Sequence, residues 1–409
     1  EVAHEMPWFL PDGKTVLFDI RRTGAATPDG TTTIVALTLA TGERRDLFPG
    51  MVLGAVGGDR LIIQREEAIL AVPFDFNRMA ATGDATPFLS QPTSFKRFVF
   101  ANIPLFAVAS SGTAVFYPRS SQEDDSPLLL VEPGGKSTRL TLPVHRYSDP
   151  RVSPDGTRIA VHVFEDTRDN WIADLRRGTF MRLTFDSGED ETPCWSPDGR
   201  WVYWTATRAN RSRVIYRKAA DGTGPEQEIW KGDTHVHLGG VTPDGTTLVM
   251  STVAGQSTQI VAVSVADGTE TPLVTTPFAN QEPAISPDGK WLAYASDESG
   301  RKEVYVQPYP SLQGRAQISA GGGGQPVWAR TGSRLFYRGS EKIMAVNVAM
   351  KDGIHASAPT VVMDDIYDST QAFSHTAYDV APDGRFLMIG KRPAAQGSVN
   401  HLQIIYPAR

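Results

Sequence analysis

The sequence predicts an all-β fold, a β-propeller of four-stranded antiparallel blades. One observation is a turn motif ending in Pro-Asp-Gly, whose consecutive copies at Ser153, Ser196, Thr242 and Ser286 begin 43, 46 and 44 residues apart. This spacing is the length of one propeller blade. A second observation is the alternating apolar stretch after each copy, which is typical of a β-strand. Clear copies occupy residues 10–13, 153–156, 196–199, 242–245, 286–289 and 381–384, and altered copies occupy 57–59, 110–113 and 330–333. Nine repeats are therefore predicted.

The motif itself has the chemistry of a turn. Proline presets φ at the first turn position, aspartate caps the turn, and glycine takes the left-handed conformation that a hairpin with a bulge requires. Six clear copies carry the same aspartate. We interpret these aspartates as structural, because six equivalent turn residues cannot all be catalytic.

The best-preserved repeat shows the four strands of a blade. Its expected strands cover residues 282–285, 290–295, 303–309 and 315–319, with the first strand nearest the axis. The ninth repeat has expected strands at 378–380, 386–389 and 402–406 and lacks a fourth. A ring usually completes its last blade with a strand from the other end of the chain, which hides both sheet edges.

Two architectures fit nine repeats. We favour a single ring of nine blades, one domain over residues 1–409, because a separate three-blade fragment would leave an open apolar face and two unpaired edges. The alternative is a six-bladed ring from about residue 137 onward, preceded by three repeats. In that arrangement residues 137–142 would form the closing strand.

Three local features are given structural interpretations. An additional Pro-Asp-Gly at residues 28–30 is expected to be a second hairpin turn of the first blade. The acidic insertion at residues 120–125 is expected to be an exposed loop, with a calcium loop as the less favoured interpretation. The four glycines at 321–324 are not followed by the Lys-Ser/Thr of a phosphate loop, and we expect a flexible connection.

Composition and charge exclude several classes of partner. A formal charge of −6 gives no broad positive field, so nucleic acid is not an expected partner. No apolar run reaches the roughly 18 residues of a membrane-spanning helix, so direct membrane insertion is not expected. Cys194 stands alone and cannot form an internal disulfide. The chain opens at Glu1 without a signal-peptide pattern, which indicates a processed or trimmed chain.

Several strings in the second half of the chain resemble a known family. Residues 291–300, 303–306, 326–330 and 335–338, with the phrases at 71–76 and 378–388, are similar to the WD40-like Pro-Asp repeats of the TolB type. The likeness is greatest to the C-terminal sensor region of bacterial membrane-anchored serine/threonine kinases. It implies a bacterial interaction or sensor domain, a periplasmic or other extracytoplasmic location, and an upstream kinase or regulator domain. No catalytic residue belongs to the motif.

The chain also lacks the sequence motifs of common enzymes. Gly-x-Ser-x-Gly, His-Glu-x-x-His and the catalytic motifs of kinases are absent. We therefore predict no catalytic residue and expect a protein that is not an enzyme.

Polar residues near the start of each first strand are the candidate ligand-binding residues, because these strands line the central channel. Carboxylates and imidazoles that converge there could hold a divalent cation or a cationic peptide end, or could simply be solvated. His235 lies two residues before His237 on a strand, so the two share a face. The candidate set is Asp149, Glu191, His237, Glu282, Gln325 and His375.

Two functions remain open at this point. The first is a non-catalytic module that binds or senses a protein, a peptide or an envelope component. The alternative is a metal-dependent hydrolase, lactonase or lyase with its site at the channel mouth. Such an enzyme would bind one divalent ion through Glu191, Glu282 or His237 and lose it to a chelator.

Overall fold

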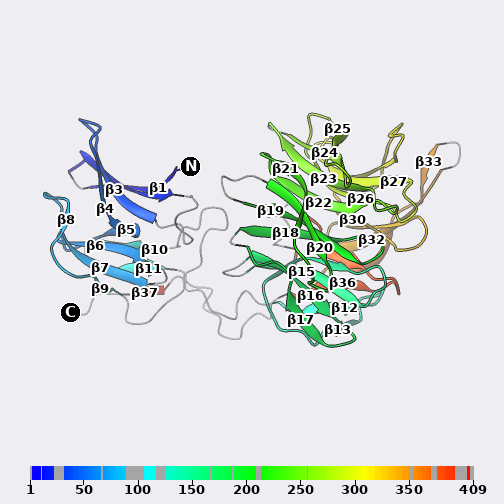
Figure 1. The fold of residues 1–409 in the computed structure, drawn as a ribbon, viewed down its shortest axis with the longest axis horizontal. Coiled ribbons are helices and arrows are strands. Elements are labelled where there is room, and N and C mark those ends of the chain that lie inside the picture. Colours follow the sequence, from blue (N-terminus) through cyan, green and yellow to red (C-terminus); the bar gives the residue numbers. More distant parts are fainter. Residues whose placement is uncertain are drawn as a thin grey trace. The chain divides into compact units, whose positions relative to one another are not determined.

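In the computed structural model, β-strands joined by turns run through the described part of the chain (Figure 1). The described residues are 2–10, 12–22, 32–65, 68–88, 106–116, 126–164, 168–186, 188–208, 213–255, 257–350, 353–369, 375–391 and 403–405. Within them the strands form antiparallel sheets, most of which have four strands, so the predicted all-β class is confirmed. The motif at 28–30 and the acidic insertion at 120–125 lie outside the described residues.

The chain divides into two compact units. Unit 1 comprises residues 1–124 and 394–409, and unit 2 comprises residues 125–393. This division differs from the single body of residues 1–409 that the repeat pattern predicts.

Unit 1 contains three sheets. Its first sheet has β1 (Val2–Phe9), β2 (Thr15–Arg22), β3 (Thr32–Thr38) and β4 (Arg44–Pro49). The second has β5 (Met51–Val56), β6 (Arg60–Arg65) and β7 (Ala68–Asp75), with β8 (Ala80–Ala81) and β9 (Thr86–Pro87) both pairing with β7. The third has β10 (Phe106–Val108), β11 (Ala114–Phe116) and β37 (Gln403–Ile405). Leu17, Ile34, Leu61 and Phe74 are buried in a core that the first two sheets share.

Unit 2 contains six sheets, and four of them follow the order of the chain. They are formed by β14 (Tyr147–Val152), β15 (Arg158–Phe164), β16 (Arg168–Asp174) and β17 (Thr179–Arg182); by β18 (Glu189–Trp195), β19 (Trp201–Thr207), β20 (Arg213–Ala219) and β21 (Gln227–Gly232); by β22 (Val236–Val241), β23 (Thr247–Ala254), β24 (Ser257–Ser264) and β25 (Glu270–Val274); and by β26 (Asn280–Ile285), β27 (Trp291–Ser296), β28 (Glu303–Pro308) and β29 (Ala316–Gln317). The last of these confirms the four strands expected for the best-preserved repeat.

The fifth sheet has one additional strand. It contains β30 (Gly324–Trp328), β31 (Arg334–Arg338), β32 (Lys342–Met350) and β33 (Ile354–Ala356), and β34 (Thr360–Asp364) also pairs with β32. The sixth sheet combines β35 (Tyr378–Val380) and β36 (Phe386–Ile389) with β12 (Leu128–Val131) and β13 (Ser137–Arg139), in the order β13-β12-β36-β35.

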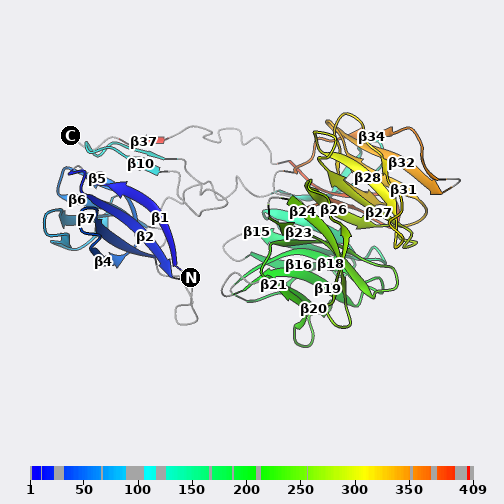
Figure 2. The ribbon, with the colours of Figure 1, turned by 90° about the horizontal axis from the view of Figure 1, so that it is seen from above.

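One edge strand from each of these six sheets lies in a closed circle, and we call these six strands the inner strands. β14, β18, β22, β26, β30 and β35 each contact the next, and β35 also contacts β14. Figure 2 shows the sheets following one another around unit 2, from β15 and β16 through β23 and β24 to β31 and β32. This arrangement corresponds to the six-bladed alternative.

The ring closes through the sixth sheet. Leu128 pairs with Ile389 and Val131 with Phe386, so β12 occupies the position next to β36. Leu128 and Leu130 pack on one side with residues of the first sheet, while Val131 packs on the other side with residues of the fifth. Burial on both faces requires this strand to lie between two blades.

Two expected strand assignments are therefore wrong. The strand adjacent to β36 is residues 128–131, and the expected closing segment at 137–142 supplies only the outer strand β13. The strand expected at 402–406 as a part of the ninth blade instead contributes β37, which pairs with β11 in unit 1. The apolar pattern specifies that these segments are strands, but it does not specify which sheet edge each one meets.

The Pro-Asp-Gly turns have the predicted structural role. The hydroxyls of Ser153, Ser196, Thr242 and Ser286 each donate to the aspartate two residues later, all at 2.6 Å. The glycines that follow have φ between 69° and 75°. Such a φ favours glycine, since a side chain there is strained. These aspartates therefore stabilise turns, as expected.

The glycine tract is held by a carboxylate. The backbone N–H groups of Gly321 and Gly322 donate to Glu303 Oε1 at 3.0 and 2.9 Å. Ser319 Oγ donates to the other oxygen of Glu303 at 2.5 Å. The expectation of a flexible connection is thus wrong, because these hydrogen bonds to a buried carboxylate fix the tract.

The closure of the ring can be tested with two fragments of unit 2. We expect residues 125–393 to unfold cooperatively, and residues 143–393, which lack β12 and β13, to lose the cooperative transition. The apolar side chains of β12 are almost entirely buried, at 1 % exposed for Leu128 and 0 % for Val131. Burial of each such side chain stabilises the fold by about 2 kcal/mol, against a total of about 5–15 kcal/mol. Thermal unfolding followed by circular dichroism measures the difference, and equal midpoints would contradict the closure.

The turn aspartates predict a loss of stability in acid. Burial opposes ionisation of Asp155, but hydrogen bonds from Ser153 and Thr157 outweigh it and lower its pKa to about 2. Hydrogen bonds from Ser196 and Arg200 lower the pKa of Asp198 to about 2 as well. Because both pKa values are depressed by folding, their contribution is present above about pH 4 and lost as the pH falls through 2.

We expect the double variant Asp155→Asn, Asp198→Asn to be less stable than the native chain at pH 7 and to lose less stability between pH 4 and pH 2. Urea unfolding over that pH range is the measurement. Asp233→Asn, an exposed position outside these turns, is the control and should follow the native chain.

Candidate functional site

Five of the inner strands carry an irregularity near their start. Pairing with the second strand of the sheet shifts between residues 148 and 151 in β14 and at the corresponding places in β18, β22, β26 and β30. Four of the residues at these bulges have a positive φ, namely Asp149 at 51°, Thr192 at 49°, Glu282 at 57° and Gln325 at 52°. Non-glycine residues rarely adopt this conformation, and they persist in it where neighbouring contacts hold them.

Glu282 and Gln325, two of the predicted ligand-binding residues, link adjacent sheets. Glu282 Oε2 accepts the backbone N–H of Gln325 at 2.7 Å, and Oε1 accepts from Lys302 Nζ at 2.6 Å. Gln325 Oε1 in turn accepts the N–H of Ala377 at 3.0 Å. These side chains satisfy backbone groups of the next inner strand. Their polarity is thus explained by contacts within the ring.

Asp149 makes a different contact, with a histidine across the closure of the ring. Its Oδ1 lies 2.8 Å from His375 Nδ1, and the exposed fraction is 0 % for the Asp149 side chain and 10 % for that of His375. Burial opposes the charged form of His375, but the charges of Asp149 and Glu191 outweigh it and raise the pKa of His375. Burial also opposes ionisation of Asp149, yet His375 lowers the pKa of this carboxyl.

Four of the six predicted residues are brought together here. Glu191, His237 and His375 each offer a donor atom, and the three atoms lie within 4.8 Å of one another. The His237 ring centroid is 4.3 Å from that of His375 and 4.5 Å from that of His235. We call Asp149, Glu191, His235, His237 and His375 the histidine cluster. Its members come from four different sheets of the ring.

The imidazoles of His237 and His235 are held neutral. Burial and then the neighbouring His375 and His235 lower the pKa of His237 well below its ordinary value. Burial and then Arg213 lower the pKa of His235. A neutral imidazole has a nitrogen lone pair that can accept a proton or bind a cation. The cluster can therefore bind a cation or a hydrogen-bond donor.

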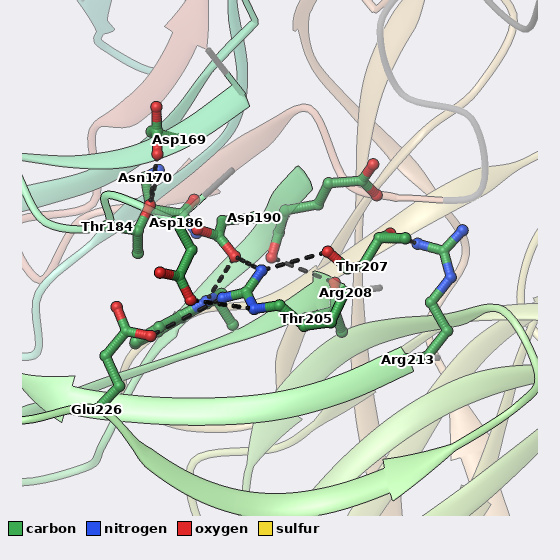
Figure 3. Close-up of polar contacts among 12 residues, drawn as sticks. Asp169, Asn170, Thr184, Asp186, Asp190, Thr205, Thr207, Arg208, Arg213 and Glu226 are labelled. Carbon is green, nitrogen blue, oxygen red and sulfur yellow. Dashed lines mark hydrogen bonds and ion pairs between the residues drawn. The ribbon is translucent and has the colours of Figure 1, made fainter. Parts of the chain in front are cut away.

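A network of charges around Arg208 lies at the start of β18 (Figure 3). Arg208 lies 2.7 Å from Asp190 Oδ1, 3.3 Å from Asp186 Oδ2 and 3.8 Å from Glu226 Oε2. Trp204 Nε1 also donates to Asp190 at 3.1 Å. Burial and the two neighbouring aspartates raise the pKa of Glu226, since three carboxylates share one guanidinium. The network fixes the backbone that presents Glu191.

A cavity of about 350 Å³ lies at the other end of the inner strands, toward the Pro-Asp-Gly turns. The turn prolines at 154, 197, 243 and 287 contribute to its wall, as do Trp195 and Trp328. The residue three positions before each turn proline, or before Arg330 in the fifth sheet of unit 2, also lines it. These equivalent residues are Arg151, Cys194, Gly240, Ala284, Val327 and Asp379.

Sequence reasoning missed this cavity because it searched only the starts of the first strands. The sequence did contain a signal for the cavity, because the six equivalent lining residues each lie three positions before a turn residue. Cys194 is buried, which raises its thiol pKa to about 11. The thiol therefore stays protonated at neutral pH and packs as a small side chain.

Arg330 stands where the other turns have proline, at the turn of the fifth sheet of unit 2, and it connects three sheets. Its Nη2 donates to Asp379 Oδ2 at 2.6 Å and to the carbonyl of Val152 at 2.9 Å. Its Nε donates to the carbonyl of Val380 at 2.9 Å, and Asp379 Oδ2 also accepts the N–H of Val152 at 2.8 Å. We call these contacts the Arg330 clasp. They join the ends of β30, β35 and β14.

A comparison with protein families assigns the ring. Residues 136–330 match the family model of the TolB beta propeller domain. The ring is a TolB-type β-propeller. The resemblance stated from the Pro-Asp repeats is thereby confirmed as to fold type, whereas the closer likeness to kinase sensor regions stays a prediction.

Curated relatives match parts of this chain. The Tol-Pal system protein TolB of Francisella tularensis is 30% identical over 168 residues, which are 40% of this chain and 38% of that protein. An uncharacterized peptidase, YuxL of Bacillus subtilis, is 24% identical over 208 residues, which are 39% of this chain and 32% of that protein. The chain thus spans between about 30% and 40% of the length of these two relatives.

A solved structure shows the same fold. A structure described as a TolB from Agrobacterium tumefaciens has a TM-score of 0.52 and 16% sequence identity, and the match covers 66% of this chain and 99% of that one. In the part of the chain that the structure describes, no helix has the length and apolar character needed to span a membrane.

The Arg330 clasp predicts a stability difference between two arginine variants. Arg330→Met leaves the Asp379 carboxylate, which is 8 % exposed, without its charged partner. We expect a loss of roughly 2–3 kcal/mol, since removal of one partner strands a largely buried charge. Arg385→Met is the matched control, because its pair with Asp383 is exposed and contributes little. Urea unfolding measures both, and equal losses would show that the clasp is not a principal contact.

Proposed function

We propose that this chain is a non-catalytic binding module that recognises a segment of a partner protein or peptide in the cavity at the turn end of the inner strands. The observation that carries this proposal is the cavity itself. Its volume of about 350 Å³ falls in the range of ligand pockets and can take a few side chains of a partner.

The residues around the cavity are of the types that dominate protein interfaces. Trp195 and Trp328 supply aromatic surface, and Arg151 supplies a guanidinium. Aromatic residues and arginine are enriched among the residues that contribute most to binding.

The wall of the cavity is also held in place before any ligand arrives. Trp195 Nε1 donates to the carbonyl of Arg151 at 3.0 Å, and Trp328 Nε1 donates to that of Ala284 at 3.1 Å. Arg151 Nη1 donates to the carbonyl of Thr376 at 2.9 Å. A wall fixed by such bonds loses little conformational entropy on binding, which favours affinity.

The cellular setting is part of the proposal. Similarity to the Tol-Pal system protein TolB supports a protein or envelope component as the partner. The resemblance of the repeats to sensor regions supports a bacterial protein with a periplasmic or other extracytoplasmic location, and an upstream kinase or regulator domain in a longer protein.

A variant that fills the cavity tests the proposal. Gly240 lines the cavity, and a Cβ at this position would meet no atom within 4 Å. Gly240→Trp should therefore fold and block the cavity. The neighbouring Gly239 is unsuitable, since its Cβ would lie 2.0 Å from the Pro283 carbonyl oxygen. Ala266→Trp places the same side chain at an exposed turn of the same sheet and is the matched control.

We expect the native chain and Ala266→Trp, once immobilised, to retain the same protein from bacterial envelope extract with and without EDTA. Gly240→Trp should retain at least tenfold less of it by quantitative mass spectrometry. Equal retention by all three chains, or specific retention by none, would contradict the proposal.

A metal-dependent hydrolase, lactonase or lyase is the second candidate. Its support is the histidine cluster and the similarity to a relative named as a peptidase. Turnover of an ester, lactone or uronate substrate that is lost with Glu191→Gln and kept in Gly240→Trp would favour this candidate over the binding module.

A further inference from the structure

We propose that Glu191, His237 and His375 bind one divalent transition-metal ion at the start of the inner strands. This site lies at the opposite end of these strands from the cavity of the proposed function, and it does not depend on that function. Two imidazoles and one carboxylate form a ligand set that Zn²⁺ and neighbouring transition metals accept.

The three donor atoms come from fixed positions. Glu191 lies on β18 and His237 on β22, while His375 precedes β35, so each comes from a different sheet of the closed ring. Their donor atoms already lie within 4.8 Å of one another. Ligand atoms of a tetrahedral Zn²⁺ site lie about 3.4 Å apart, as follows from bond lengths near 2.1 Å, so side-chain rotation can complete the site.

Asp149 orients one ligand. Its Oδ1 lies 2.8 Å from His375 Nδ1, so the lone pair available to an ion is on Nε2. A carboxylate that accepts from the non-ligating nitrogen of a metal-bound histidine is a recurrent feature of zinc sites, because it fixes the tautomer and increases the basicity of the ring. Asp149 is therefore a positioning residue.

His237 supplies an independent observation. Its Nδ1 is buried and has no hydrogen-bond partner among the described residues. An unsatisfied buried polar atom is costly, and coordination to a cation would satisfy one of the two ring nitrogens.

Two cationic residues lie near the site. Arg168 forms an ion pair with Glu189, and Arg213 donates a hydrogen bond to Thr207 Oγ1. The charges of both arginines also act on Glu191, so an ion competes with them for this carboxylate. Three protein ligands also leave positions on the ion for water or for a ligand group, which is the coordination pattern of reactive or ligand-binding zinc sites.

Metal binding is measured on the full chain after dialysis against EDTA. Zn²⁺ is added at pH 7.5 in competition with a chromophoric chelator. We expect one Zn²⁺ per chain, an affinity at least 100-fold lower for Glu191→Gln, His237→Ala and His375→Ala, and an affinity about 10- to 100-fold lower for Asp149→Asn. His355→Ala, an exposed histidine outside the cluster, should bind as the native chain does.

Thermal unfolding separates lost binding from lost folding. Zn²⁺ should raise the midpoint of the native chain and leave that of a folded cluster variant unchanged, because an ion that binds only the folded state stabilises it. If His375→Ala does not fold, Glu191→Gln and His237→Ala decide the question. Absence of saturable Zn²⁺ binding by the folded native chain, or equal binding by the cluster variants and His355→Ala, would overturn the proposal.

Discussion

The closure of the ring in unit 2 is the constraint on which the rest of this unit depends. β12, from the start of the unit, pairs with β36 at its end, and its apolar side chains pack against the sheets on both sides. The Arg330 clasp adds charged hydrogen bonds that join the fifth, sixth and first sheets. A propeller sheet cannot bury both faces alone, so each sheet is stable only when the circle is complete.

Closure also creates the candidate site. Asp149 belongs to the first sheet and His375 to the last, and the two residues are 226 positions apart in the chain. Only the completed ring places the Asp149 carboxylate beside the His375 imidazole and brings both next to Glu191 and His237. The histidine cluster and the Arg330 clasp therefore both include contacts between the last and the first sheet. The cluster lies near the start of the inner strands, and the clasp lies near the turns.

The inner strands use equivalent positions for two purposes. At most bulges a polar side chain satisfies the backbone of the next strand, as Glu282 and Gln325 do. At the closure, Asp149 instead contacts a histidine, and its other oxygen has no hydrogen-bond partner among the described residues. Equivalent bulge positions therefore hold adjacent inner strands together in most sheets, and at the closure the same position contributes to the polar histidine cluster. The cavity at the turn end follows the same logic, since six equivalent positions line it.

The sequence by itself determined the repeat, the turns, the four strands of a blade and the polar character of the inner strand starts. These are local properties, set by Pro-Asp-Gly geometry and by alternation of apolar residues over a few positions. Tertiary structure decided the division into two units, the pairing of residues 128–131 with β36, and the placement of residues 403–405 in unit 1. It also decided that Asp149, Glu191, His237 and His375 meet while Glu282 and Gln325 serve the backbone. The physical reason is that sheet edges look alike in sequence, and the partner of each edge or bulge side chain is selected only when the ring closes.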